Sequence, residues 1–461
     1  MKKLKIYGIL RNTLSASIGN SVVVLALAVL LGCSDTARVD ATGKGSIRGI
    51  NSIADAPELN FLIEERSIDT AFFKEAAGFA EYDDLTYNFN FDGFLTSAPN
   101  ITRIATQSLD VRADTEHTII LSGSLASPTT TVWEDPAREF SDTDTVFEAD
   151  FYHLAASVGE VDIYFATVGT TPVLGAAVGS LNVGERISYR EFPDGAFELI
   201  VTAKDDPNVI LHQSGDISAA AATRVSVGLF DPDPSITANI GVALITADGT
   251  SLAIPDVNSP SRVRLLHAAS GTGNIDGFVN NDLTTAVFPN VAFGEIANYV
   301  DTLVFPLPTT ITAAGNSGAP IVEQDVTLGA NASKTIALAG DPANPVLREL
   351  NDNARPISTF PQLRLTSFSV NAGPVDIYLV EPGTTISADS LPLFFNLPFL
   401  LDTGFVGPDG GTFDMLVAAA GSQIPISAPL SVTLQNGAVL DAAILDTVDP
   451  TVVELRIINA Y

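Results

Sequence analysis

An internal repeat with a period of roughly one hundred residues constrains the fold of this chain more than any other feature. The segment FYHLAASVGEVDIYF, which begins at Phe151, returns in related form at Val263 and at Leu363, and a weaker copy begins at Ile47. Apolar and polar residues alternate in these copies, and β-branched and aromatic types dominate, as in a β-strand. A period of this length fits one small β-sandwich per repeat.

Two landmarks mark every copy. The first lies within the repeated segment, where Asp162, Asp276 and Asp376 occupy equivalent places and Asn60 holds that place in the first copy. Because a second landmark keeps its order relative to the first in all four copies, the sequence predicts four copies of one domain. This second landmark is a strand-like segment that begins at Glu116, Ala222, Ser333 and Val439.

Turn-forming residues are spread along the whole chain, whose 35 glycines and 27 prolines leave little room for long helices. The Pro-Asp-Gly sequence at Pro193 favours a tight hairpin, because Asp-Gly tolerates the positive φ that such a turn needs. One exception is residues 68–80, whose three phenylalanines and Ala76 approximate a helical face and predict a short helix. The fold class predicted for the rest is all-β, a tandem array of four immunoglobulin-like β-sandwich domains.

The N-terminus has the pattern of an export signal. Four basic residues within the first eleven positions precede an apolar run at residues 22–31, which is followed by Gly32 and Cys33. A run of this length is too short for a transmembrane helix, which needs roughly 20 apolar residues. The four residues Leu30-Leu31-Gly32-Cys33 resemble the bacterial lipobox.

The lipobox resemblance implies that Cys33, the only cysteine, is acylated and that the mature protein begins there. It also implies an outer-membrane location, because Ser34 rather than aspartate follows the cysteine. The alternatives are an ordinary cleaved signal beside a chance cysteine, and a buried cysteine of a cytosolic protein. Whether the domains face the periplasm or the outside is left open. The segments predicted are a signal peptide (1–32), a lipidated tether (33–44), and four β-sandwich repeats of which the first is degenerate (45–135, 146–255, 261–350 and 361–461).

Charge and composition exclude some classes of function. The chain has 54 acidic and 23 basic residues and a net charge of −31, so it would repel a phosphate backbone, and nucleic acid is not expected as a partner. Because 46% of the residues are hydrophobic, there is ample material for folded cores. With a single cysteine, no disulfide can form within the chain.

No catalytic motif is present: the sequence lacks His-Glu-x-x-His, Gly-x-Ser-x-Gly and the phosphate loop. His153 and His267 occupy equivalent places, which favours one structural role per domain, such as bonding a neighbouring loop. Asp162, Asp276 and Asp376 are interpreted as solvent-facing or turn-bonding carboxylates. The alternative is that each helps to hold a calcium ion, which prefers several oxygen ligands.

The pattern Arg-x-x-His-Ala, followed by an Asp-x-Tyr/Phe strand, a Gly-x-Phe-x-x-x-Val segment and a Thr-x-x-x-x-Gly strand, resembles the bacterial domain-of-unknown-function family 4397. The resemblance is best at residues 261–340, fair at 148–230 and 363–445, and poor at 45–125. It implies immunoglobulin-like repeats on an exported protein and brings no activity with it.

These observations predict a non-enzymatic protein, anchored to the membrane through acylated Cys33, that serves in adhesion, scaffolding or binding of a protein or glycan partner. No cofactor is expected. The alternative is a calcium-dependent glycan- or ion-binding module, with Asp162, Asp276 and Asp376 as candidate ligands. An enzyme is a third hypothesis, and it would need a pocket that joins His153 or His267 to carboxylates.

Overall fold

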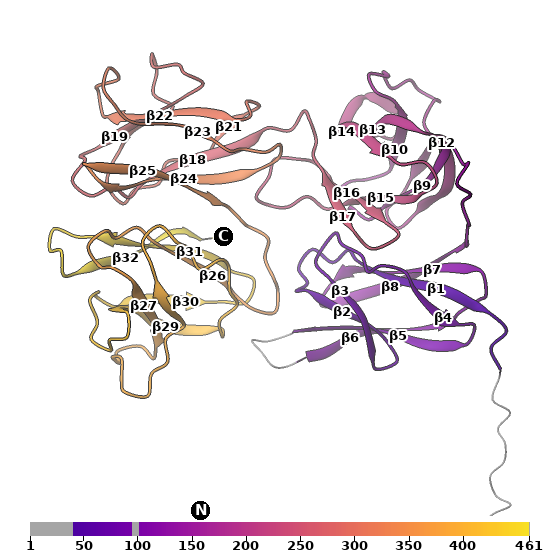
Figure 1. The fold of residues 1–461 in the computed structure, drawn as a ribbon, viewed down its shortest axis with the longest axis horizontal. Coiled ribbons are helices and arrows are strands. Elements are labelled where there is room, and N and C mark those ends of the chain that lie inside the picture. The colour runs from indigo at the N-terminus through magenta and orange to yellow at the C-terminus, as the bar shows by residue number, and fades with distance from the viewer. Residues whose placement is uncertain (1–39, 95–100, 461) are drawn as a thin grey trace, which may run out of the picture. The chain divides into compact units, whose positions relative to one another are not determined.

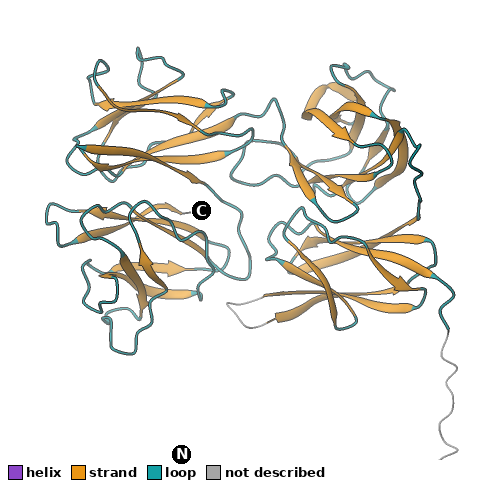
Figure 2. Ribbon diagram, in the orientation of Figure 1, coloured by secondary structure: helices purple, strands orange, loops and turns teal. Residues whose placement is uncertain are grey.

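The computed structural model describes residues 40–94 and 101–460, and in that part of the chain every regular element is a β-strand (Figure 2). The prediction of an all-β chain of tandem β-sandwiches is confirmed. Among the described residues there is no helix of the length and apolarity needed to cross a membrane. The predicted signal peptide, Cys33 and most of the predicted tether lie outside the described residues.

The described residues of the first sandwich form eight strands, labelled in Figure 1. They are β1 (Lys44–Asn51), β2 (Leu59–Ile63), β3 (Arg66–Ala71), β4 (Ala80–Asp83), β5 (Thr86–Phe94), β6 (Ile101–Asp110), β7 (Thr115–Ser124) and β8 (Ser127–Pro136). One sheet has the order β4-β1-β7-β8 and the other β3-β2-β5-β6. Between them the rings of Phe61, Phe89 and Phe91 pack edge to face and tilted, with centroids 5.1–6.1 Å apart.

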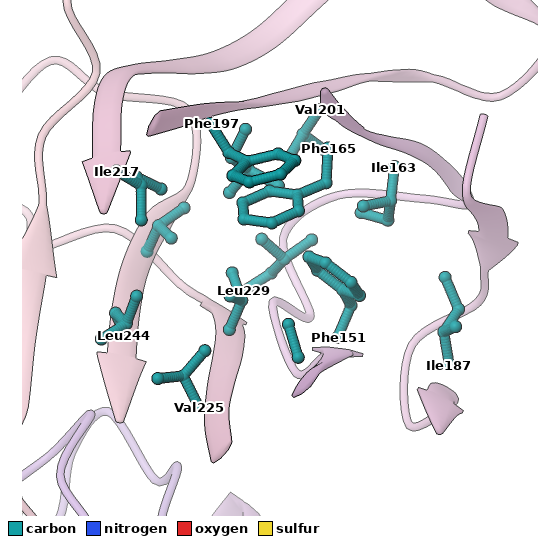
Figure 3. Close-up of a cluster of buried hydrophobic side chains, with 14 of the residues drawn as sticks. Phe151, Ile163, Phe165, Ile187, Phe197, Val201, Ile217, Val225, Leu229 and Leu244 are labelled. Atoms are coloured by element: carbon teal, nitrogen blue, oxygen red, sulfur yellow. The ribbon is translucent and has the colours of Figure 1, made fainter. Parts of the chain in front are cut away.

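The second sandwich adds one edge strand to the same plan. Its strands are β9 (Val146–His153), β10 (Val161–Thr167), β11 (Gly179–Leu181), β12 (Arg186–Pro193), β13 (Gly195–Ala203), β14 (Asp206–Ala219), β15 (Arg224–Phe230), β16 (Gly241–Thr246) and β17 (Ser251–Ile254). The sheets have the orders β12-β9-β15-β16-β17 and β11-β10-β13-β14. Figure 3 shows their core, in which the stacked rings of Phe165 and Phe197 lie opposite Phe151.

The third sandwich repeats the eight-strand plan, with sheets β21-β18-β24-β25 and β20-β19-β22-β23. These are β18 (Ser261–His267), β19 (Ile275–Val279), β20 (Phe288–Val291), β21 (Val300–Thr302), β22 (Leu307–Ala313), β23 (Pro320–Val326), β24 (Ser333–Asp341) and β25 (Asn344–Asn351). Its core is mainly aliphatic, with Leu265, Ile311, Ile336 and Leu338 fully buried around Phe288.

In the fourth sandwich two isolated bridges, Leu363 to Val406 and Thr366 to Asp402, replace one short edge strand. Its strands are β26 (Gln362–Ser367), β27 (Val375–Val380), β28 (Phe394–Leu397), β29 (Gly411–Ala419), β30 (Leu430–Leu434), β31 (Val439–Asp446) and β32 (Val453–Ala460). They form the sheets β26-β31-β32 and β28-β27-β29-β30.

One feature is common to all four sandwiches: the first strand pairs in parallel with the strand of the second sequence landmark. These pairs are β1 with β7, β9 with β15, β18 with β24, and β26 with β31. All four first strands are buried almost throughout, although only alternate residues can face the core of their own sandwich. Their outward faces are therefore covered by something else.

The helix predicted for residues 68–80 was wrong. The backbone that follows β3 runs along the edge of β1, where the Lys74 N–H donates to the Asn51 carbonyl and the Ala77 N–H to the Gly49 carbonyl, both at 2.9 Å. These bonds engage amide groups that a helix would need for its own ladder. The apolar residues are spaced as in a helix, but the segment pairs with the edge of β1 instead.

The outward face of the second sandwich offers a test of this packing. A methyl group on Gly228 would overlap the buried rings of Tyr152 and Phe230, so Gly228→Ala should lower the free energy of unfolding by about 1–3 kcal/mol. Gly159→Ala is the matched control, because its added methyl group would meet nothing within 4 Å. Urea unfolding followed by circular dichroism measures both, and equal stability of the two variants would contradict the packing described.

Candidate functional site

The three aspartates singled out from the sequence lie in three different sandwiches and are all buried. Asp276 accepts hydrogen bonds from the Asn290 backbone at one oxygen and from the Gly315 backbone at the other, both at 2.7 Å. Asp376 is bonded in the same way, by the amides of Asn396 and Gly421 at 2.7 and 2.8 Å. Each carboxylate thus ties the edge strand of its sheet, β20 or β28, to the turn that follows β22 or β29.

Asp162 plays the corresponding part with different partners. Its oxygens accept bonds from the Ser180 hydroxyl at 2.6 Å, from Lys204 at 3.2 Å and from the Asp205 amide at 2.9 Å. Burial alone would raise the pKa of Asp162, but these three donors outweigh it and lower the pKa below its ordinary value. The carboxylate therefore stays ionised at neutral pH.

The structure does not bring Asp162, Asp276 and Asp376 together. Within residues 40–94 and 101–460, no group of three or more His, Cys, Asp or Glu side chains is placed to hold a metal ion. The turn-bonding interpretation describes these aspartates, whereas a solvent-facing position does not, because all three are buried.

His153 and His267 also have equivalent surroundings. Each ring bonds through Nε2 to a carbonyl six residues later, that of Gly159 at 2.9 Å or Gly273 at 2.6 Å. In both, Nδ1 accepts the backbone N–H two residues later, which leaves Nε2 as the protonated nitrogen of a neutral ring. Burial lowers both pKa values, so the two rings are uncharged at neutral pH and hold a loop.

An arginine stacked on an aromatic ring occurs on the outward face of every sandwich, and the sequence interpretation did not identify it. In three sandwiches the arginine stands on the first strand, three residues before the position equivalent to His153 and His267. In the second sandwich Asp150 occupies the position of the arginine, and the stacked arginine comes from β15 instead. The stacked pairs are Arg48 with Phe79, Arg224 with Tyr189, Arg264 with Tyr299, and Arg364 with Phe405, with 4.4–4.6 Å from guanidinium carbon to ring centre.

These outward faces pack against one another in twos, within the unit Gly43–Tyr461. We call the first and second sandwiches the first pair, and the third and fourth the second pair. Each pair shares an apolar cluster contributed by both members. The first cluster includes Ile50, Ile120, Tyr152, Leu154, Phe230 and Ile245, and the second Leu266, Ala337, Leu350, Phe368, Ala443 and Leu445.

A buried carboxylate lies beside the apolar cluster in the second pair. Asp352, whose side chain has no exposed surface, accepts hydrogen bonds from the Tyr299 hydroxyl at 2.6 Å and the Thr335 hydroxyl at 2.8 Å. Arg264 of the third sandwich and Arg364 of the fourth lie 3.6 and 3.4 Å from its oxygens. Because both members of the pair supply a guanidinium, the carboxylate links them.

The first pair has its own version of this link. Asp135, at the end of β8, receives two hydrogen bonds from Arg186 of the second sandwich, at 2.5 and 3.1 Å. Deeper in the contact, Arg48 of the first sandwich donates to the Ser226 hydroxyl of the second at 2.8 Å, beside the fully buried Asp150. In both pairs, then, an aspartate at the end of the last strand of one sandwich meets an arginine of the next.

A cavity opens next to the stacked ring in each pair. In the second pair it has a volume of about 680 Å³ and is lined in part by Phe405, Gly404 and Arg364. In the first pair it has about 500 Å³ and is lined in part by Tyr189 and Arg224. The lining of both is mixed in charge.

One signal could have revealed these contacts: the arginine of the Arg-x-x-His pattern. Arg48, Arg264 and Arg364 are repeated where strand alternation points a side chain out of its own sandwich. An isolated domain has no evident use for a repeated arginine in the middle of an outward strand face. The acidic partners gave no comparable signal, because Asp135 and Asp352 stand in segments that look like ordinary polar linkers.

Asp150 supplies a pH-dependent test of the first pair. Burial raises its pKa from 3.8 to about 6, in part offset by Arg48 and a hydrogen bond from Ser226. Between these two pH values the folded chain holds a proton that the unfolded chain has lost, so the contribution of Asp150 to stability falls as the pH rises from about 4 to 6. Asp150→Asn should remove this loss, which amounts to at most about 3 kcal/mol.

We therefore expect Asp150→Asn to be at least as stable as the wild type at pH 7 and to lose that advantage at pH 4. Thermal unfolding between pH 4 and pH 7 measures the stability of both proteins. Asp216→Asn, an exposed position on the same sandwich, is the control. If Asp150→Asn and the wild type showed parallel pH profiles, the buried, proton-binding carboxylate would be refuted.

Asp276→Asn tests the turn-bonding role. An amide nitrogen cannot accept the backbone N–H that one carboxylate oxygen accepts now, so the free energy of unfolding should fall by about 1–3 kcal/mol. Asp301→Asn, an exposed position in the same sandwich, should change it by less than about 0.5 kcal/mol. If calcium raised the melting temperature of the wild type but not that of Asp276→Asn, a cation at this aspartate would be supported instead.

Comparison with known proteins adds one result. No curated protein matches the sequence. The family model described as "Domain of unknown function (DUF4397)" matches residues 45–164 and 261–378, together just over half of the chain, and each match runs from the first strand of one sandwich into the second strand of the next. The first sandwich, expected to resemble this family poorly, lies within the first match. The chain therefore belongs to the DUF4397 family.

Proposed function

We propose that this protein is a non-enzymatic component of the bacterial cell envelope, anchored to the outer membrane by lipid on Cys33, that presents stiff pairs of β-sandwiches to a partner. The observation that carries the proposal is the double sandwich pair. The apolar clusters and the bonds of Asp135 and Asp352 hold neighbouring domains in fixed contact, as a scaffold requires.

The bonding of the histidines supports a non-enzymatic role. His153 and His267 are fully buried and engaged with backbone groups of their own sandwiches. Within the described residues neither ring is hydrogen-bonded to a carboxylate, which a general base of the usual kind would need.

The chain's own charge also favours a presenting role over a membrane-embedded one. A net charge of −31 repels anionic lipid headgroups and other copies of the chain. A lipid on a single residue would then be the membrane contact, and two or more acyl chains suffice for stable anchoring.

The anchor is tested by changing residues 33 and 34. Cys33→Ala should remove the protein from the outer-membrane fraction, because no acyl chain can be attached. Ser34→Asp should move the protein to the inner membrane, where an aspartate after the acylated cysteine retains lipoproteins that carry the lipobox, and Ser34→Ala is its control. Separation of the two membranes on a density gradient, followed by immunoblotting, measures all three.

The proposal fails if Cys33→Ala stays with the outer membrane. Presentation to a partner is tested separately, by crosslinking in intact cells and mass spectrometry of the wild type against Cys33→Ala. Crosslinks to a defined envelope protein that disappear in the released variant would support it. Equal, unspecific crosslinking of both would count against it.

A further inference from the structure

The two cavities beside the stacked rings occupy equivalent places in the two pairs. Phe405 and Tyr189 both stand one residue before the position that pairs with the first strand of their sandwich, at Val406 and Arg190. The stacked arginine lines the cavity in both cases. So does the interface aspartate, Asp352 in one and Asp135 in the other. A cavity that recurs with the same parts is a feature of the pair rather than an accident of one junction.

The charged groups of the larger cavity already pair with one another. Lys334 lies 2.7 Å from Glu349, and Arg348 lies 2.9 Å from Asp402. Arg364 is held by Asp441 at 2.6 Å as well as by Asp352. An anionic or cationic ligand would have to break these pairs, so it gains little from the charges.

The smaller cavity follows the same rule. Arg138 bonds Glu148 and Glu191, and Arg224 bonds Glu148 at 2.5 Å and Glu116 at 2.8 Å. Each guanidinium thus contacts two carboxylates, and the exposed Glu139 is the lining charge that stands outside these pairs. Because the cationic groups that line both cavities are engaged by carboxylates, both cavities disfavour an anionic ligand.

Uncharged or solvent-facing polar groups supply the remaining hydrogen-bonding capacity. Gln324 and Asn351 line the larger cavity, and Glu139 and Ser188 line the smaller one, all with exposed side chains. An amide both donates and accepts, as a sugar hydroxyl does, and the half-buried ring beside them offers an apolar surface for the C–H face of a pyranose. Volumes of about 680 and 500 Å³ lie within the range of small-ligand sites.

We propose that each pair binds a neutral oligosaccharide in this cavity, with a sugar ring against Phe405 or Tyr189 and its hydroxyl groups bonded to the polar side chains at the rim. The charge pairs of the lining act as fixed donors and acceptors that keep their partners when the sugar binds. This site needs no metal ion, which separates it from calcium-dependent recognition. It is independent of the lipid anchor.

Saturation-transfer difference NMR tests the proposal on the full chain in detergent, with three neutral trisaccharides as probes: maltotriose, cellotriose and chitotriose. Trigalacturonate is the charged comparison. At least one neutral probe should bind with a Kd on the order of 1 mM, in the presence of a calcium chelator. Trigalacturonate should give no signal.

Four variants locate the binding. Phe405→Ala should remove about half of the saturation transfer, and Phe405→Ala with Tyr189→Ala should abolish it. Gln324→Ala, an exposed change that leaves the fold intact, should weaken binding by about tenfold at the larger cavity. Phe395→Ala, which removes a ring that is 79% exposed on the same sandwich outside the cavity, should bind as the wild type does.

The proposal is overturned if none of the neutral probes binds, if trigalacturonate alone binds, or if the double variant keeps the full signal. It is also overturned if Phe395→Ala reduces binding as much as Phe405→Ala, because the sugar would then recognise exposed rings in general. Circular dichroism melting of each variant establishes that lost binding does not come from lost folding.

Discussion

Burial of charged groups between sandwiches is the constraint on which the rest of this structure depends. A carboxylate such as Asp352 can be buried only where hydrogen-bond donors and guanidinium groups surround it, and here they come from both members of the pair. Removing one partner of such a group costs about 3–5 kcal/mol, because the other is left buried and unpaired. The apolar clusters favour association of the two sandwiches, whereas the charged groups allow only one relative orientation of the two.

Most of the architecture could be predicted from the sequence, because it rests on local rules. Alternation with period two, turn residues and the four-fold recurrence were enough for the fold class. The failure at residues 68–80 has a physical reason: the spacing of Phe72, Phe73 and Ala76 fits a helix, yet an open edge of β1 offered hydrogen-bond partners that the pattern cannot show. Tertiary pairing outweighed a weak local preference.

The candidate site was harder to predict than the fold. Asp276 was found by its recurrence, but its role depends on amides 14 and 39 residues further along, and nothing local shows that β20 and the turn after β22 converge on it. Likewise Glu148, Asp150 and Tyr152 lie on the face of β9 that strand alternation alone would assign to solvent. Only the contact with the first sandwich explains how a strand can be buried on both faces.

The use of one face for pairing has a consequence for how such a chain can grow. A sandwich without a neighbour would expose Leu266 or Tyr152 together with a row of unsatisfied polar groups, a surface prone to unwanted association. Duplication of a single domain would therefore expose such a surface, whereas duplication of a whole pair would not. Proteins built on this plan should gain domains in even numbers, or two chains should associate through the face of an unpaired domain.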